Sequence, residues 1–169
     1  MAEAIRTVAV LVANPALSSI LSMTLAGSST LRVRPFDSQL ALTTYLHLAP
    51  VDLIVADFDS VPSRADHLAE DLRRDDKLER RDFQLIALAS ELTTETKAAS
   101  IHAGIDEIIM KPMSPKYLVE RVLARLAKRS PAAKPLAPVS KSAIKPKEGW
   151  AKFGDNVVPL FARTPEPQH

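Results

Sequence analysis

The feature that most constrains the fold is a regular alternation of short apolar runs with helix-like stretches up to about residue 129. A continuous apolar run such as TVAVLVA at residues 7–13 is typical of a strand that is covered on both faces. Alternating strands and helices predict an α/β fold with a parallel sheet. The expected strands are residues 7–13, 31–34, 51–56, 84–89 and 107–110.

The stretches between these runs contain residues that start and stop helices. Asn14 can cap a helix with Pro15 in its first turn, and Gly104 can end another helix. Near residue 120, apolar side chains recur at helical spacing. The expected helices cover about residues 15–26, 38–48, 63–74, 94–103 and 115–126.

The composition changes after Arg129. Seven of the 13 prolines lie beyond it, and there the 6 basic residues exceed the 3 acidic ones, against 16 basic and 17 acidic before it. We therefore expect a domain at residues 1–129 and a mostly disordered Pro/Lys-rich tail at residues 130–169, with a short apolar motif at residues 149–161.

Several protein classes are excluded by what the chain lacks. It contains no cysteine, which excludes a disulfide framework and thiolate metal sites. The beginning of the chain has neither a signal peptide nor an apolar span of about 20 residues, so we expect a cytoplasmic protein that does not enter the membrane. With only four glycines and no phosphate loop or nucleophile elbow, we do not expect an enzyme.

The polar residues that carry chemistry stand at the ends of the expected strands. Asp57 and Asp59 follow residues 51–56, Ser90 follows residues 84–89, and Lys111 follows the last run. Ligands of open α/β sheets bind at the carboxyl ends of the strands, so these side chains predict a site there.

Three segments carry a resemblance to a known family. The segments VDLIVAD (51–57), LIALAS (85–90) and AGIDEIIMKPMSPKYLVERV (103–122) resemble the acceptor strand, the fourth strand, and the fifth strand with its Lys-Pro pair and last helix in response-regulator receiver domains. The resemblance implies a flavodoxin-like, doubly wound, five-stranded parallel sheet in the order 2-1-3-4-5 with five helices.

The resemblance also implies roles for individual residues. Asp57 is placed as the phospho-acceptor, Lys111 and Ser90 as phosphate-binding residues, and the bond from Lys111 to Pro112 as a cis peptide. Independently, an aspartyl phosphate requires a carboxylate nucleophile and donors that stabilise the transferred group.

The Mg²⁺ site of the family is only partly present. The family's acidic pair falls here at Val12-Ala13 or Ala13-Asn14, and neither pair contains an acid. Mg²⁺ prefers hard oxygen ligands, so Asp57, Asn14 and Asp59 are expected to form a weak site or none.

Two switch positions of the family are substituted. Ala89 stands where the fourth strand ends in Ser or Thr, and Ile108 stands where the fifth strand carries an aromatic residue. Ser90 comes one residue later, which on a strand is the opposite face. We therefore expect weak or altered coupling between Asp57 and the surface of the fourth helix and fifth strand.

Structural alternatives stay open for several residues. Asp57 could be a helix-capping acid, and Asp59 a loop acid that faces solvent. In the tail, the residues of the apolar motif predict a docking segment that folds back on the domain or binds another protein: Trp150, Phe153, Leu160 and Phe161.

Three functions are compatible with this sequence. The first is an atypical receiver in two-component or phosphorelay signalling, which acts by protein contact with a histidine kinase or histidine phosphotransferase and accepts a phosphoryl group on Asp57. The second is a phosphorylation-independent pseudo-receiver that serves as an adaptor or scaffold. The third is a regulator that contacts nucleic acid through its basic tail. The family resemblance also allows a homodimer.

Overall fold

The computed structural model describes residues 4–60, 63–128 and 157–159. Its sheet has the strand order β2-β1-β3-β4-β5-β6, in which the first five strands are parallel and β6 is antiparallel to β5. The strands are β1 (Arg6–Leu11), β2 (Leu31–Phe36), β3 (Leu53–Asp57), β4 (Gln84–Ala89), β5 (Glu107–Met110) and β6 (Val157–Pro159). The helices are α1 (Pro15–Ala26), α2 (Gln39–Leu48), α3 (Ala65–Arg74), α4 (Thr94–Ala103) and α5 (Pro115–Lys128).

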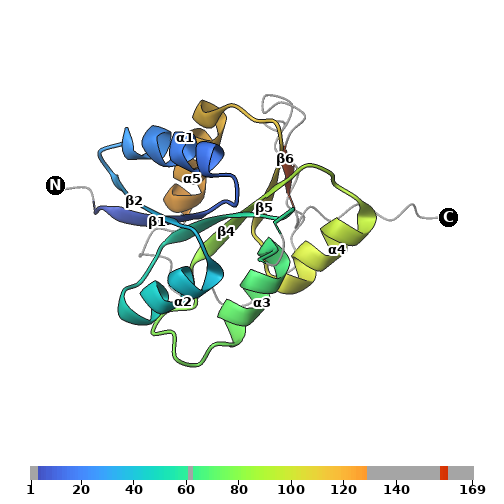
Figure 1. The fold of residues 1–169 in the computed structure, drawn as a ribbon, viewed down its shortest axis with the longest axis horizontal. Helices are drawn as coiled ribbons and strands as arrows, with labels where there is room; N and C mark the ends of the chain where they lie inside the picture. Colours follow the sequence, from blue (N-terminus) through green and yellow to red (C-terminus); the bar gives the residue numbers. More distant parts are fainter. Residues whose placement is uncertain (1–3, 61–62, 129–156, 160–169) are drawn as a thin grey trace, which may run out of the picture.

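The helices cover both faces of the sheet (Figure 1). One apolar cluster joins α1 and α5 to the sheet through side chains such as Leu21 and Leu118. A second cluster, which includes Leu42 and Leu68, joins α2, α3 and α4 to the other face. This confirms the predicted doubly wound sheet with order 2-1-3-4-5 and five helices.

The position of each strand in the sheet explains its composition. All residues of β3 (LIVAD) are buried because this strand is central and both faces are covered. In contrast, β2 (LRVRPF) alternates in burial and contains Pro35, which an edge strand tolerates because the missing N–H faces no neighbouring strand.

Several helices begin close to where the sequence indicates, whereas α3 begins at Ala65, two residues later than expected, without a side-chain cap. The side chain of Asn14 accepts a hydrogen bond from Leu17 N at the start of α1, where Pro15 is the first helical residue. Ser38 and Thr93 cap α2 and α4 in the same way. At the end of α4, Gly104 has a φ of 77°, the left-handed conformation that glycine adopts without steric cost.

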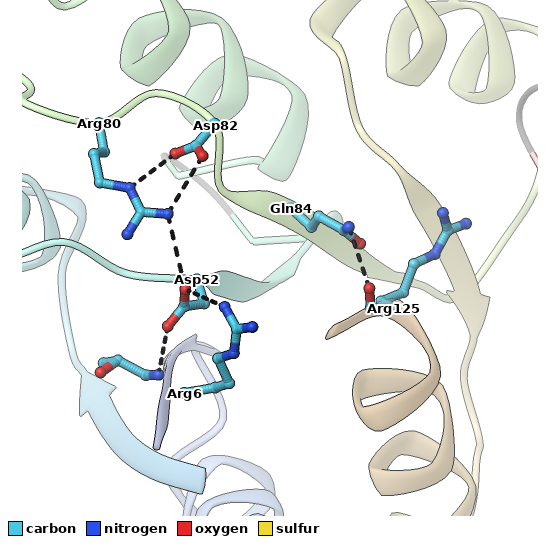
Figure 2. A network of polar contacts seen from close by, with 7 residues as sticks. Arg6, Asp52, Arg80, Asp82, Gln84 and Arg125 are labelled. Carbon is cyan, nitrogen blue, oxygen red and sulfur yellow. Dashed lines mark hydrogen bonds and ion pairs between the residues drawn. The ribbon is translucent and has the colours of Figure 1, made fainter. Parts of the chain in front are cut away.

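A polar network holds the ends of the strands opposite to the predicted site (Figure 2). The Asp52 carboxylate accepts a 2.9 Å hydrogen bond from Thr7 N and lies 3.5 Å from Arg6 and 3.9 Å from Arg80. On the neighbouring strand, Gln84 donates a 3.2 Å hydrogen bond to the carbonyl of Arg125 in α5. These contacts join β1 to the residue before β3, and β4 to α5, at the edge of the sheet that is far from Asp57.

Part of the tail extends the sheet. The backbone of β6 pairs with β5, with Val158 opposite Ile108 and Val157 opposite Ile109. This sixth strand was not among the expected strands, although it lies within the apolar motif predicted at residues 149–161. Among the helices that the structure describes, none is long and apolar enough to cross a membrane.

Candidate functional site

The parallel sheet brings together residues that are far apart in the sequence. Asp57 is the last residue of β3, Ser90 follows β4, and Lys111 follows β5. The backbone N–H of Lys111 donates to the Ala89 carbonyl at 2.8 Å, which aligns the ends of β4 and β5. The Lys111-Pro112 bond is cis, as the family resemblance implies.

Asp57 lies at the bottom of the site, with 8% of its side chain exposed. Its Oδ1 atom accepts hydrogen bonds from Lys111 Nζ and from the backbone N–H of Asp59, each at 3.0 Å. The helix-capping alternative does not hold, because α3 begins only at Ala65 after Arg64. Asp57 instead forms a charged pair with Lys111 at the carboxyl end of the sheet.

Asp59 is bound more extensively than Asp57. Its Oδ2 atom accepts hydrogen bonds from Ser90 N at 2.8 Å and Ser90 Oγ at 2.7 Å, and it lies 2.8 Å from Lys111 Nζ. The side chain is 37% exposed, so it is at the rim of the site, yet it does not simply face solvent. Asp59 is therefore an exposed loop acid, as the structural alternative describes, whose carboxylate is also bound by Ser90 and Lys111.

These contacts change the proton affinities of the pair. Partial burial raises the pKa of Asp59, but the hydrogen bonds from Lys111 and Ser90 and the charge of Lys111 outweigh it and place the pKa below its ordinary value. Burial lowers the pKa of Lys111, whereas its hydrogen bonds and charge interactions with Asp59 and Asp57 outweigh burial and raise it. Both groups are therefore held in their charged forms.

Ser90 lies on the side of the site, contrary to the expectation that it would face away. The alternation of side chains holds only within a strand, and β4 ends at Ala89. The chain turns at Ser90 and directs both its N–H and its hydroxyl to Asp59. Ser90 and Lys111 therefore contact the same carboxylate oxygen of Asp59, and phosphate binding by Ser90 stays a prediction.

The residues around Asp57 do not fit a Mg²⁺ site. The side-chain oxygen of Asn14 caps α1, and the Asp59 carboxylate is engaged by Ser90 and Lys111. Val12, the residue after β1, is 4% exposed and packs in the apolar cluster with side chains of α1 and α5. Within the described residues, no group of three or more His, Cys, Asp and Glu side chains could hold a metal ion.

The substituted switch positions are both inside the core. Ala89 and Ile108 are fully buried in the cluster that joins the sheet to α2, α3 and α4. Neither side chain carries a hydroxyl or an aromatic ring that could change its contacts with the site. Of the docking motif, Val157–Pro159 forms β6, whereas Trp150, Phe153, Leu160 and Phe161 lie outside the described residues.

A cavity of about 580 Å³ lies next to Asp59 and Ser90. Its lining includes Arg64 and Glu95, so charged groups of both signs surround the opening. Arg64 is held in place by two hydrogen bonds to Asp66 and by its position 4.8 Å above the ring of Phe58. The site is thus open to a partner on the side of α4.

Sequence reasoning did not single out the buried carboxylates of Asp66 and Glu107. Glu107, at the start of β5, is fully buried and accepts hydrogen bonds from Arg121 and Arg125 of α5. The spacing of these arginines, one helical turn apart on the face of α5 that also carries Leu118 and Val122, is the signal that could have indicated a buried partner.

Known proteins resemble this chain in fold more than in sequence. No protein-family model and no curated protein matches it. Among solved structures, the BeF₃-activated receiver domain of DrrB from Thermotoga maritima is 19% identical, with a TM-score of 0.62 over 73% of this chain and 98% of that chain. A CheY-like receiver domain protein from Methanospirillum hungatei is 18% identical, with a TM-score of 0.66 over 74% of this chain and 96% of that chain.

A third similar structure is HP1043, an orphan response regulator of H. pylori. It is 19% identical, with a TM-score of 0.61 over 72% of this chain and 96% of that chain. At these identities the likeness concerns the fold, and the fold is that of response-regulator receiver domains.

Proposed function

We propose that this chain is an atypical response-regulator receiver that acts by protein contact in a two-component or phosphorelay pathway, with Asp57 as the phospho-acceptor. The observation that carries this proposal is the pair of Asp57 and Lys111, whose Oδ1 and Nζ atoms are 3.0 Å apart at the carboxyl end of the sheet. The partner is a histidine kinase or a histidine phosphotransferase, and the protein works in the cytoplasm.

The chemistry is transfer of a phosphoryl group to a carboxylate. A carboxylate oxygen of Asp57 forms a bond to phosphorus while the bond from phosphorus to the imidazole nitrogen of the phosphohistidine breaks. The electron pair of that bond stays on the imidazole, which then takes up a proton. The Lys111 ammonium, held charged by its carboxylate neighbours, neutralises the negative charge of the transferred group.

The second candidate is a phosphorylation-independent pseudo-receiver that serves as an adaptor. It is favoured by the engagement of Ser90 and Lys111 with Asp59, because these donors are then already occupied. In both candidates the output is contact with another protein and not catalysis. Further contacts, with a downstream protein through the tail or with a second copy of the chain, are compatible with either candidate.

Phosphorylation separates the candidates. The full chain is incubated with acetyl phosphate and, separately, with a phosphorylated histidine phosphotransferase, each with and without Mg²⁺, and its intact mass is measured. The receiver gains the mass of one phosphoryl group, and Asp57→Asn gains none. If the wild type gains no mass with any donor, the phospho-acceptor role is wrong and the pseudo-receiver stands.

A binding measurement tests the partner. A receiver that docks on a histidine phosphotransferase binds it in a titration by calorimetry, whether or not phosphoryl transfer follows. Ser19→Arg, at an exposed position of α1, should weaken binding if the partner contacts this helix. His67→Ala, at an exposed position of α3 on the opposite face of the sheet, serves as its control. If the chain binds none of the histidine phosphotransferases and histidine kinases tested, neither class of protein is its partner.

A further inference from the structure

Three hydrogen-bond donors converge on a single carboxylate oxygen. They are the N–H and the hydroxyl of Ser90 and the ammonium of Lys111, and all lie within 2.8 Å of Oδ2 of Asp59. The donors come from the ends of β4 and β5, whereas the carboxylate comes from the loop after β3. Residues from three separate segments therefore form one cluster of hydrogen bonds around Asp59.

This donor set suits an oxyanion. A backbone N–H, a hydroxyl and an ammonium that point to one position form charge-assisted hydrogen bonds with a negatively charged oxygen. The same Lys111 ammonium also contacts Oδ1 of Asp57, as does the N–H of Asp59. An anion beside the Asp57 carboxylate would thus need the donors that Asp59 holds.

We propose that Asp59 is an internal carboxylate ligand that occupies the oxyanion-binding donors beside Asp57 and competes there with inorganic phosphate or a phosphoryl group. This inference deepens the proposed function, on which it rests, because it assigns a regulatory role to a residue of the same pocket.

Charge and hydrogen bonding both explain the competition. In the wild-type pocket, Asp57 and Asp59 share the single positive charge of Lys111. A phosphate ion that approaches is repelled by the excess carboxylate and must displace the hydrogen bonds of Ser90. Without the Asp59 carboxylate, the charges of Asp57 and Lys111 balance and the donors of Ser90 and Lys111 become accessible.

The contact also joins two loops. The hydrogen bonds from Ser90 connect the loop before α4 to the loop after β3, through Asp59. In the absence of any phosphate, the carboxylate therefore holds the donors of Ser90 and Lys111 together as a bound oxyanion would. A phosphoryl group that arrives therefore changes the arrangement of these donors less than it would in a pocket whose donors are unoccupied.

The test is a titration of the full chain with inorganic phosphate, followed in ¹H–¹⁵N NMR spectra through the backbone amide of Ser90. Asp59→Ala is expected to bind phosphate at least about tenfold more tightly than the wild type, with the largest shift at Ser90. Glu95→Ala is the matched control, because it removes the same charge from the lining of the same cavity and Glu95 is not an acceptor of these three donors.

Each outcome decides the proposal. Equal phosphate affinity in Asp59→Ala and the wild type overturns it, and so does an equal gain in Glu95→Ala or a shift that omits Ser90. Asp59→Asn keeps the shape of the side chain, removes its charge and is expected to gain affinity in the same direction. If Asp59→Ala does not fold, the phosphate affinity of Asp59→Asn tests the proposal in its place.

The outcome is independent of phosphoryl transfer. Inorganic phosphate binds without forming a covalent bond, so the titration reports on Asp59 even if Asp57 never becomes phosphorylated. Conversely, a wild type that is phosphorylated at Asp57 but whose Asp59→Ala variant binds phosphate no better would leave the receiver function intact and overturn only the role of Asp59.

Discussion

The carboxylate of Asp59 lies 2.8 Å from the ammonium of Lys111, closer than the 3.0 Å that separates Lys111 from Asp57. The lysine that the family resemblance assigns to the acceptor is therefore shared with a second acid two residues further along the chain. This relationship distinguishes the pocket from a simple pair of acceptor and cation.

Replacing the shared cation should release Asp59. In Lys111→Met, the pKa of Asp59 is expected to rise, because the lysine's hydrogen bond and charge are lost while the partial burial that raises the pKa remains. The measurement is an NMR titration of the side-chain carboxyl carbons. Lys116→Met, on an exposed position of α5, should leave the Asp59 titration unchanged; an unshifted Asp59 in Lys111→Met would contradict the shared-cation arrangement.

Acid stability should depend on Asp75. A hydrogen bond with His47, at 2.7 Å, and one from Lys77 N lower the pKa of Asp75 below its ordinary value of 3.8. The folded protein is therefore stabilised above that value, and this contribution is lost as the pH falls through the folded-state pKa.

Chemical denaturation at several pH values tests this dependence. Between neutral pH and about pH 3, the wild type should lose more stability than Asp75→Asn. Asp76→Asn provides the control, because the Asp76 side chain is 93% exposed. Parallel curves for the wild type and Asp75→Asn would show that this contact makes no contribution.

The buried acid of β5 should be essential for stability. Glu107→Ala leaves the guanidinium groups of Arg121 and Arg125 without their carboxylate in a site where these side chains are only 14% and 16% exposed. Loss of one partner of a buried ion pair costs about 3 kcal/mol of unfolding free energy. Glu120→Ala, on an exposed position of α5, should change stability by less than about 0.5 kcal/mol; equal effects of the two variants would rule out the structural role of Glu107.

Two glycines offer a matched pair of substitutions. Gly104→Ala should destabilise the protein by about 1 kcal/mol, because a side chain is disfavoured at a φ of 77° even though the added Cβ meets only Arg73 Nε at 3.5 Å. Gly27, with a φ of −63°, has an ordinary helical backbone, so the main obstacle to an added Cβ is the Thr24 carbonyl oxygen at 3.2 Å, which must shift slightly. Gly27→Ala should therefore cost less, and thermal unfolding of both variants checks the order.

The edge of β5 should become accessible when the tail is removed. Since β6 pairs with Glu107–Ile109 through backbone hydrogen bonds, deletion of residues 130–169 should speed hydrogen exchange of the β5 amides. Deletion of residues 160–169 alone keeps β6 and should leave β5 protected. Equal exchange in the full chain and in the longer deletion would mean that β6 does not protect β5 in solution.

Local signals in the sequence were sufficient for most of the fold. Asn14 caps the first helix as its side chain predicts, because capping depends on backbone groups only two or three residues away. The central strand β3 was recognised from its apolar run, because burial on both faces requires such a run. The strand β6 was not recognised, because it is short and its pairing partner lies far away in the sequence.

The candidate site, like the fold, can be predicted from the sequence only in part. The repeated strand–helix pattern is sufficient to place Asp57 and Lys111 at the carboxyl ends of parallel strands, whereas the expected strand order comes from the family resemblance. The hydrogen bonds of Asp59 with Ser90 and Lys111 became evident only in the folded structure. They depend on how the chain turns beyond β3 and β4, where the alternation of strand side chains no longer applies. The position of Asp57 can thus be predicted from the sequence pattern. The occupation of the Ser90 and Lys111 donors by Asp59 depends on the conformation of the folded loops.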